Sequence, residues 1–163
     1  WRGATVPTLT EILETIPEQG VIYIEIKDKS PEMISQIKEQ ADNIGLRPAQ
    51  VVIISFTDEV IAAAKKVMPE AKAYLLTGLN YTGNGFEPEA TELIARMRQI
   101  NADGIDCQAN IALDREFIRT IQDAGYEFHV WTVDDISRAE SLIKLGVDSI
   151  TTNCANVMNT ALG

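Results

Sequence analysis

The chain has 163 residues, a formal net charge of -10 at pH 7, and 45% hydrophobic and 23% charged residues. This proportion of hydrophobic to charged residues is enough to bury one hydrophobic core and leave a solvated surface. It predicts a single domain over residues 1–163. The acidic charge excludes nucleic acid and anionic membranes as main partners, because both select clustered Lys and Arg. No apolar run is long enough to predict a transmembrane segment, and the first residues show no signal-peptide core, so the sequence assigns no compartment.

Short β-branched runs alternate with amphipathic stretches along the whole chain. Strands that alternate with helices pair in parallel through right-handed crossovers, which predicts an α/β fold. A (β/α)8 TIM-type barrel takes roughly 250 residues, so the six βα units found here would form an incomplete barrel. The expected strands cover residues 21–27, 51–55, 73–76, 104–107, 128–133 and 149–152.

Glycines mark the expected ends of three of the intervening helices. Gly45, Gly125 and Gly146 each lie just past the last apolar helical position, where a left-handed residue closes a helix at little cost. The Gly-Ile-Asp stretch at 104–106 echoes the Gly-Val-Asp stretch at 146–148. This echo is expected where a repeated unit turns into its next strand.

Two opposite charges interrupt the apolar strand expected over residues 21–27. Side chains alternate across a strand, so Tyr23, Glu25 and Lys27 share one face and the isoleucines between them share the other. If the isoleucine face packs under helices, Glu25 and Lys27 point into the interior of the sheet or barrel. An ion stays charged there only if it is paired or holds a metal or substrate. The alternative is a buried structural ion pair.

Three other features carry weaker signals. Residues 77–86 form the longest irregular segment, and we expect a flexible lid or leaving-group contact there rather than a phosphate cradle, because no helix begins at its glycines. Cys107 and Cys154 have no metal or disulfide spacing and are expected to be free, small hydrophobic residues. Asp134 and Asp135 are expected to begin the next helix, where carboxylates favour the dipole and cap free amides.

Five motifs, in matching order and spacing, resemble the glycerophosphodiester phosphodiesterase family over nearly the whole chain. The resemblance implies a (β/α)8 barrel. The motifs are Val6-Pro7-Thr8-Leu9 with Glu11 and Leu13, Tyr23 through Lys27, Ile54-Ser55-Phe56, Val130-Trp131-Thr132-Val133, and Gly146-Val147-Asp148 with Ile150-Thr151-Thr152.

The family's earlier motifs, a His-Arg-Gly strand, a Glu-x-Asp metal pair and a His-Asp segment, are absent from these 163 residues. Trp1-Arg2-Gly3 lies only three residues before Pro7, so it matches the loop that enters the helix. The chain has one histidine, His129, whereas the family mechanism uses two. We therefore expect the last six of eight barrel units, N-terminally truncated. Asn153 and Cys154 also replace the acidic residue and proline that often end the family's last strand.

The resemblance implies hydrolysis of glycerophosphodiesters to glycerol 3-phosphate and an alcohol, usually with a divalent cation such as Ca²⁺ or Mg²⁺. It makes Glu25 a metal ligand and Lys27 a catalytic residue beside the phosphoryl group. It makes Trp131 and Phe56 substrate contacts, with core packing and a loop anchor as their respective alternatives. The acid and base would be the two missing histidines, so the 163 residues alone are expected to be inactive.

Two further hypotheses stay open beside the hydrolase. One is a non-catalytic barrel remnant that binds a partner, or forms a homo-oligomer, through open strand edges. The other is a different barrel enzyme that acts on another phosphate ester or uses Lys27 as a Schiff-base lysine. Two histidines and a Glu-x-Asp pair upstream would favour the hydrolase, and borohydride trapping of Lys27 would favour the third. His129 itself is expected to be a satisfied structural histidine.

Overall fold

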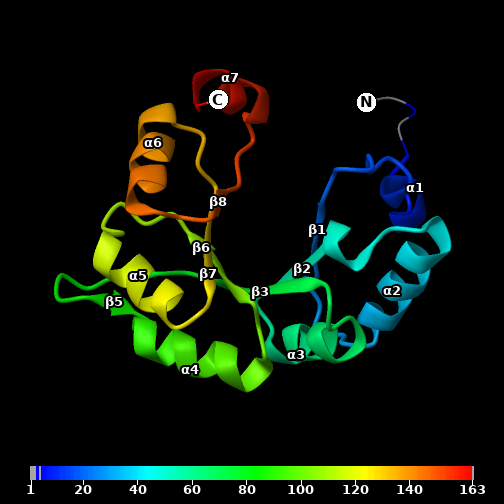
Figure 1. Ribbon diagram of the computed structural model, residues 1–163, viewed down its shortest axis with the longest axis horizontal. Coiled ribbons are helices and arrows are strands. Elements are labelled where there is room, and N and C mark those ends of the chain that lie inside the picture. Colours follow the sequence, from blue (N-terminus) through cyan, green and yellow to red (C-terminus); the bar gives the residue numbers. More distant parts are fainter. Residues whose placement is uncertain (1–2, 4, 163) are drawn as a thin grey trace. The chain divides into compact units, whose positions relative to one another are not determined.

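The computed structural model describes residue 3 and residues 5–162, which divide into two compact units, Trp1–Ala73 and Tyr74–Gly163. Each unit is described by itself (Figure 1). Trp1 and Arg2, which the sequence comparison placed in the loop entering the first helix, lie outside the described residues. None of the described helices combines the length and the apolar character needed to span a bilayer.

The first unit pairs two parallel strands and packs helices against them. β1 and β2 pair in parallel, with Ile22 opposite Val51 and Glu25 opposite Ile54, as predicted. Leu13, Ile34 and Ile53 are fully buried in this unit. In chain order its elements are α1 (Leu9–Leu13), β1 (Ile22–Glu25), α2 (Met33–Ile44), a 3-10 turn (Pro48–Gln50), β2 (Val51–Ser55) and α3 (Asp58–Val67).

Local signals in the sequence explain where the helices of this unit begin and end. Thr8 and Glu11 form a capping box: the Thr8 hydroxyl accepts from the Glu11 N–H at 3.3 Å, and the Glu11 carboxylate accepts from the Thr8 N–H at 2.7 Å. The bond from the Thr8 N–H lowers the pKa of Glu11. At the other end, Gly45 closes α2 in the left-handed conformation with φ of 81°, as predicted.

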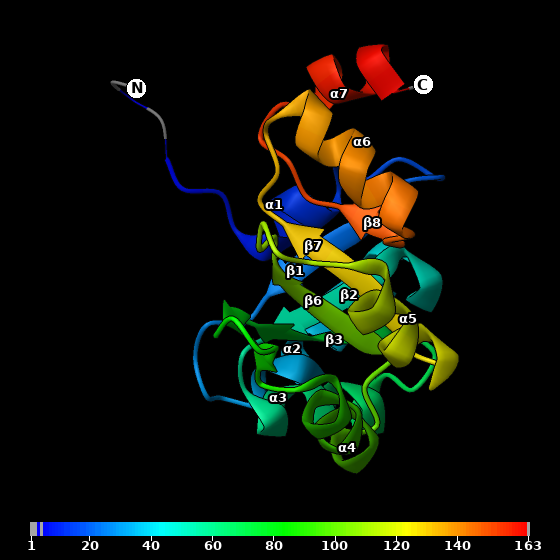
Figure 2. The ribbon, with the colours of Figure 1, turned by 90° about the vertical axis from the view of Figure 1, so that its left-hand side faces the viewer.

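The second unit continues the alternation of strands and helices. β3, β6, β7 and β8 are neighbours in that order, and each neighbouring pair is parallel. Figure 2 shows β6 and β7 side by side. The elements are β3 (Lys72–Thr77), β4 (Asn80–Tyr81), β5 (Phe86–Glu87), α4 (Ala90–Ile100), β6 (Gly104–Gln108), α5 (Arg115–Asp123), β7 (Glu127–Trp131), α6 (Ile136–Leu145), β8 (Ser149–Ile150) and α7 (Ala155–Leu162).

Most strand boundaries differ from the predicted ones by one or two residues: the observed strands cover residues 22–25, 72–77, 104–108, 127–131 and 149–150, and only β2 matches its predicted range. β1 ends at Glu25, so Lys27 lies past the strand and not within it. β7 begins one residue earlier than expected, at Glu127. The segment 77–86 is not wholly irregular, because Asn80–Tyr81 and Phe86–Glu87 pair as a short antiparallel hairpin. The hairpin is stabilised by the rings of Tyr81 and Phe86, whose centroids lie 5.3 Å apart.

We predict that the purified chain self-associates through its end strands. Within the described residues, β1 pairs with β2 alone and β8 with β7 alone, and an uncovered strand edge invites pairing with another chain. Size-exclusion chromatography with light scattering should therefore show species above 18.0 kDa as concentration rises.

A charge on the edge tests this expectation. Tyr23→Lys adds a lysine to exposed β1 and should shift the distribution toward monomer, since lysine discourages edge pairing. Val6→Lys adds the same charge at a residue that is 94% exposed and lies outside the strand, and it should leave the distribution unchanged. A monomer at every concentration would contradict the prediction.

Candidate active site

Glu25 and Lys27 lie at the C-terminal end of β1, with the Lys27 ammonium nitrogen 3.8 Å from a Glu25 carboxylate oxygen. The predicted pair therefore forms, but the burial expected for it is wrong. The Lys27 side chain is 82% exposed and that of Glu25 36% exposed. A pair this open to water adds little to stability, so its charges remain available to a ligand.

Main-chain and side-chain bonds fix the end of this strand pair. The Ile26 N–H donates to the Ile54 carbonyl at 2.9 Å, and the Ser55 hydroxyl donates to the Ile26 carbonyl at 2.7 Å. If the β1–β2 register continues, Lys27 faces Phe56, which follows β2 directly and is 50% exposed. Glu25, Lys27 and Phe56 thus share one end of this strand pair, which is the end where barrel enzymes bind substrate.

This strand end offers fewer oxygen ligands than a hard cation needs. Glu25 supplies one carboxylate, whereas Ca²⁺ takes six to eight oxygen ligands. No group of three or more His, Cys, Asp or Glu side chains within residues 3 and 5–162 could hold a metal ion. The described residues therefore do not form a complete metal site, and no step is assigned to a metal here.

Trp131 is the last residue of β7 in the second unit and is half-buried. Its indole N–H donates to the Asp106 carbonyl at 3.1 Å, and its own carbonyl accepts from the Ala109 N–H at 2.8 Å. Both its side chain and its main chain are thus tied to β6 and the residue after it. Trp131 nevertheless stays partly exposed.

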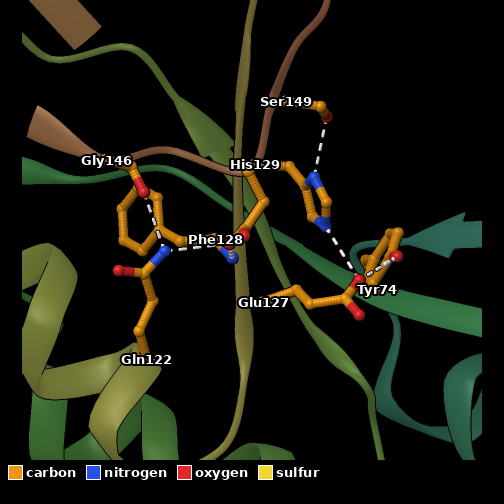
Figure 3. A network of polar contacts seen from close by, with 8 residues as sticks. Tyr74, Gln122, Glu127, Phe128, His129, Gly146 and Ser149 are labelled. Carbon is orange, nitrogen blue, oxygen red and sulfur yellow. Dashed lines mark hydrogen bonds and ion pairs between the residues drawn. The ribbon is translucent and has the colours of Figure 1, made fainter. Parts of the chain in front are cut away.

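His129 lies two residues before Trp131 and is held by polar contacts on both ring nitrogens (Figure 3). Its Nδ1 lies 2.7 Å from the Ser149 hydroxyl, and its Nε2 lies 3.4 Å from a Glu127 carboxylate oxygen. The Tyr74 hydroxyl donates to the same Glu127 oxygen, and the Tyr74 ring lies 4.2 Å from the imidazole, centroid to centroid. The Nδ1 atom thus has a hydrogen-bond partner, as expected for a structural histidine, whereas the buried Nε2 atom makes no hydrogen bond within the described residues and has the Glu127 carboxylate only at ion-pair distance.

Asp106 pairs in register with His129 and is only 2% exposed. Its Oδ1 atom makes no hydrogen bond within the described residues. Burial raises the pKa of this carboxyl group to about 7. Burial, and next the charge of Asp106, also raise the pKa of the neighbouring Cys107 thiol, so that this free cysteine stays protonated. Cys107 is therefore a small buried residue, as predicted, and no nucleophile.

We call His129 and the polar side chains around it the polar layer. The sequence analysis did not identify four of its residues: Tyr74, Asp106, Glu127 and Ser149. Two signals were present. Asp106 interrupts an apolar run, as Glu25 does, and Glu127 alternates with His129 on one face of β7. The similarity between Gly-Ile-Asp at 104–106 and Gly-Val-Asp at 146–148 suggested that both aspartates precede a strand. Asp148 does precede β8, but Asp106 lies inside β6.

Asp134 and Asp135, which follow β7, have different partners. Asp135 caps α6 as predicted, accepting from the Arg138 N–H at 2.7 Å. Asp134 does not cap this helix. Its carboxylate accepts from the Asn153 side chain and N–H and from the Thr152 hydroxyl, and these bonds lower its pKa. The loop after β7 is thereby fastened to the loop after β8.

A sequence profile of the Glycerophosphoryl diester phosphodiesterase family matches residues 1–157. The chain belongs to this family. A glycerophosphodiester phosphodiesterase of Bacillus subtilis is 26% identical over 159 residues, which are 93% of this chain and 52% of the relative. The chain thus spans about half the length of that curated relative. Members of the family generally depend on a divalent cation.

Solved structures establish the fold as that of this family, a (β/α)8 barrel type that is incomplete over these residues. A Silicibacter pomeroyi structure, described provisionally as a glycerophosphoryl diester phosphodiesterase, matches 96% of this chain and 56% of its own, with a TM-score of 0.80 and 18% identity. A phosphodiesterase of Oleispira antarctica, solved with its product sn-glycerol-3-phosphate, matches 81% of this chain and 49% of its own, with a TM-score of 0.64 and 19% identity.

We predict that Asp106→Asn flattens the pH dependence of stability. The folded pKa of about 7 lies above the ordinary aspartate pKa of 3.8, so the stabilisation is complete below about pH 4 and is lost as pH rises through 7. Between pH 5 and 8 the wild type should lose roughly 2–3 kcal/mol of unfolding free energy through this group.

Urea denaturation at several pH values measures the effect. Asp106→Asn keeps the shape of the side chain but cannot ionise, so its unfolding free energy should fall less with pH than that of the wild type. The exposed Asp123 provides the control, because Asp123→Asn removes a carboxyl group from the surface. Equal slopes for the wild type and Asp106→Asn would show that Asp106 does not titrate in this range.

Proposed function

We propose that this chain forms part of a phosphodiesterase that hydrolyses glycerophosphodiesters to glycerol 3-phosphate and an alcohol. The observation that carries the proposal is the Glu25–Lys27 pair, which lies at the C-terminal end of β1 and is open to solvent. Family membership supports it over residues 1–157. The product found in the Oleispira antarctica structure is the product expected for this chain.

Lys27 would act on the phosphoryl group. Its exposed ammonium, on a flexible stem past the end of β1, can offset the negative charge that develops on the non-bridging oxygens in the transition state. Glu25, 3.8 Å away, would orient that ammonium before substrate binds. Glu25 is also the carboxylate that this strand end offers to a divalent cation, Ca²⁺ or Mg²⁺, whose remaining ligands the described residues do not supply.

Phe56 and Trp131 would contact the substrate with aromatic surface. Phe56 is half exposed at the end of β2, which favours a ligand contact over a buried loop anchor. Trp131 is half-buried, with its indole N–H already engaged by the Asp106 carbonyl. Its exposed part can therefore pack against the carbon atoms of glycerol, while its polar atom stays satisfied within the protein.

We predict that both charges are needed for turnover but not for folding. The test is a chimera in which residues 1–163 replace the matching segment of the Bacillus subtilis relative, assayed for glycerol 3-phosphate release from glycerophosphocholine. Lys27→Ala should reduce kcat by ~10²–10³, the usual loss for one charge-stabilising donor. Glu25→Gln should also reduce turnover by orders of magnitude, because it keeps the shape and removes the charge.

Controls separate this result from misfolding. Lys29→Ala removes an exposed lysine two residues further along and should leave turnover within about threefold of the parent. All variants should unfold at the same urea concentration as the parent, since the pair is exposed. Full activity of Lys27→Ala in a folded, active chimera would overturn the role given to Lys27.

We also predict that the 163 residues alone release no glycerol 3-phosphate with Ca²⁺, Mg²⁺ or Mn²⁺. The family mechanism uses two histidines, and this chain has only His129, which is 5% exposed and has its Nδ1 atom bonded to the Ser149 hydroxyl. Metal-dependent turnover by the purified chain that disappears in His129→Gln would show instead that His129 is catalytic.

A further inference from the structure

The position of the Trp131 indole depends on β6. In the β6–β7 register, Asp106 lies opposite His129, and Gln108 lies opposite Trp131. Side chains alternate, so Asp106 and Trp131 project from the same face of neighbouring strands. The Trp131 indole reaches back along this face, because its N–H donates to the Asp106 carbonyl at 3.1 Å. The indole is therefore bonded to the main chain of Asp106, on the face from which the Asp106 side chain projects.

Among the residues that the structure describes, none bonds to the buried Oδ1 atom of Asp106 to stabilise a charge on the carboxyl group. Asp106 is 2% exposed. Leu76, its register neighbour on β3, is apolar. On the other side, the Nδ1 atom of His129 is bonded to the Ser149 hydroxyl, and its Nε2 atom lies 3.4 Å from a carboxylate oxygen of Glu127 and not of Asp106. A carboxylate in such a place would pay a desolvation cost with no ion pair to offset it.

We propose that Asp106 is a positioning residue for Trp131: its uncharged carboxyl group lets the indole lie against β6, and its ionisation turns the indole away. Ionisation requires water at the carboxylate, and the Trp131 indole, bonded to the Asp106 carbonyl, is a partly exposed group on this face. The proposal rests on the proposed function only in giving Trp131 a role toward substrate. It assigns no chemical step to Asp106.

Several other ionisable groups border this face and define the controls. Glu127 and His129 lie on β7, and Tyr74 lies on β3. An imidazole can change charge between pH 5 and 8. A pH dependence of the Trp131 quenching constant can therefore also arise from His129. Cys107, next to Asp106 along β6, projects from the opposite face. A variant that removes only the Asp106 charge therefore separates Asp106 from all of these groups.

Acrylamide quenching of tryptophan fluorescence tests the proposal without any substrate. Trp1→Phe leaves Trp131 as the sole tryptophan, because the chain has two. In this background the quenching constant should rise between pH 5 and 8.5, with a midpoint near 7 that matches the pKa of about 7 for Asp106. Added Asp106→Asn should hold the constant at its low-pH value over the whole range.

A second variant guards against a fold effect. Asp106→Leu is similar in size and permanently uncharged, and it should also hold the constant low, provided that circular dichroism shows the wild-type fold. If the titration persists in folded Asp106→Asn, it belongs to His129 or Glu127 and the proposal is overturned. If the quenching constant is high at all pH values in both uncharged variants, the absence of charge at position 106 is not enough to hold the indole against β6. The proposal then also fails.

Glycerol 3-phosphate separates this proposal from the proposed function. If Trp131 contacts substrate, the probe should protect it from acrylamide at pH 5.5 in the wild type, and less so at pH 8.5. In Asp106→Asn the protection should be equal at both pH values. Loss of the quenching titration in Asp106→Asn would support the positioning role whether or not glycerol 3-phosphate protects Trp131, whereas protection bears only on the substrate contact given to Trp131.

Discussion

The contact between Gly104 and the main chain of Glu127 is the constraint on which the polar layer of the second unit depends. A Cβ atom at Gly104 would lie 2.2 Å from the Glu127 carbonyl oxygen, so no other residue fits without separating β6 from β7. This approach sets the register that puts Asp106 beside His129. The same register brings the Trp131 indole within reach of the Asp106 carbonyl. The lack of a side chain at Gly104 thus affects the surroundings of both Asp106 and Trp131.

Much of the fold could be predicted because it follows from periodicity. The alternation of β-branched runs with amphipathic helices requires parallel strands, and left-handed glycines such as Gly45 and Gly146 end helices where expected. The hairpin within residues 77–86 could not be predicted this way. Its strands have two residues each and show no period, and its pairing depends on contact between Tyr81 and Phe86, which a pattern within either strand does not reveal.

The candidate site also has features that the sequence predicts and features that it does not. Alternation correctly put Glu25 and Lys27 together, because that relation lies within one short segment. Their exposure could not be predicted, since alternation tells which residues share a face but not what covers it. The polar layer around His129 was harder still. Tyr74, Asp106, Glu127 and Ser149 come from four strands, and only the registers between those strands bring them to one place.

The two units hold their charged groups under opposite physical conditions. The Glu25–Lys27 pair is solvated and loses little when one partner binds a ligand, so it suits a role in which charge must meet a phosphoryl group. Asp106 is shielded from water, and its charge is coupled to the packing around it. Changes to the exposed pair should therefore affect chemistry without affecting stability, whereas changes at Asp106 should affect both. This difference follows from burial alone, since all three side chains carry ordinary ionisable groups.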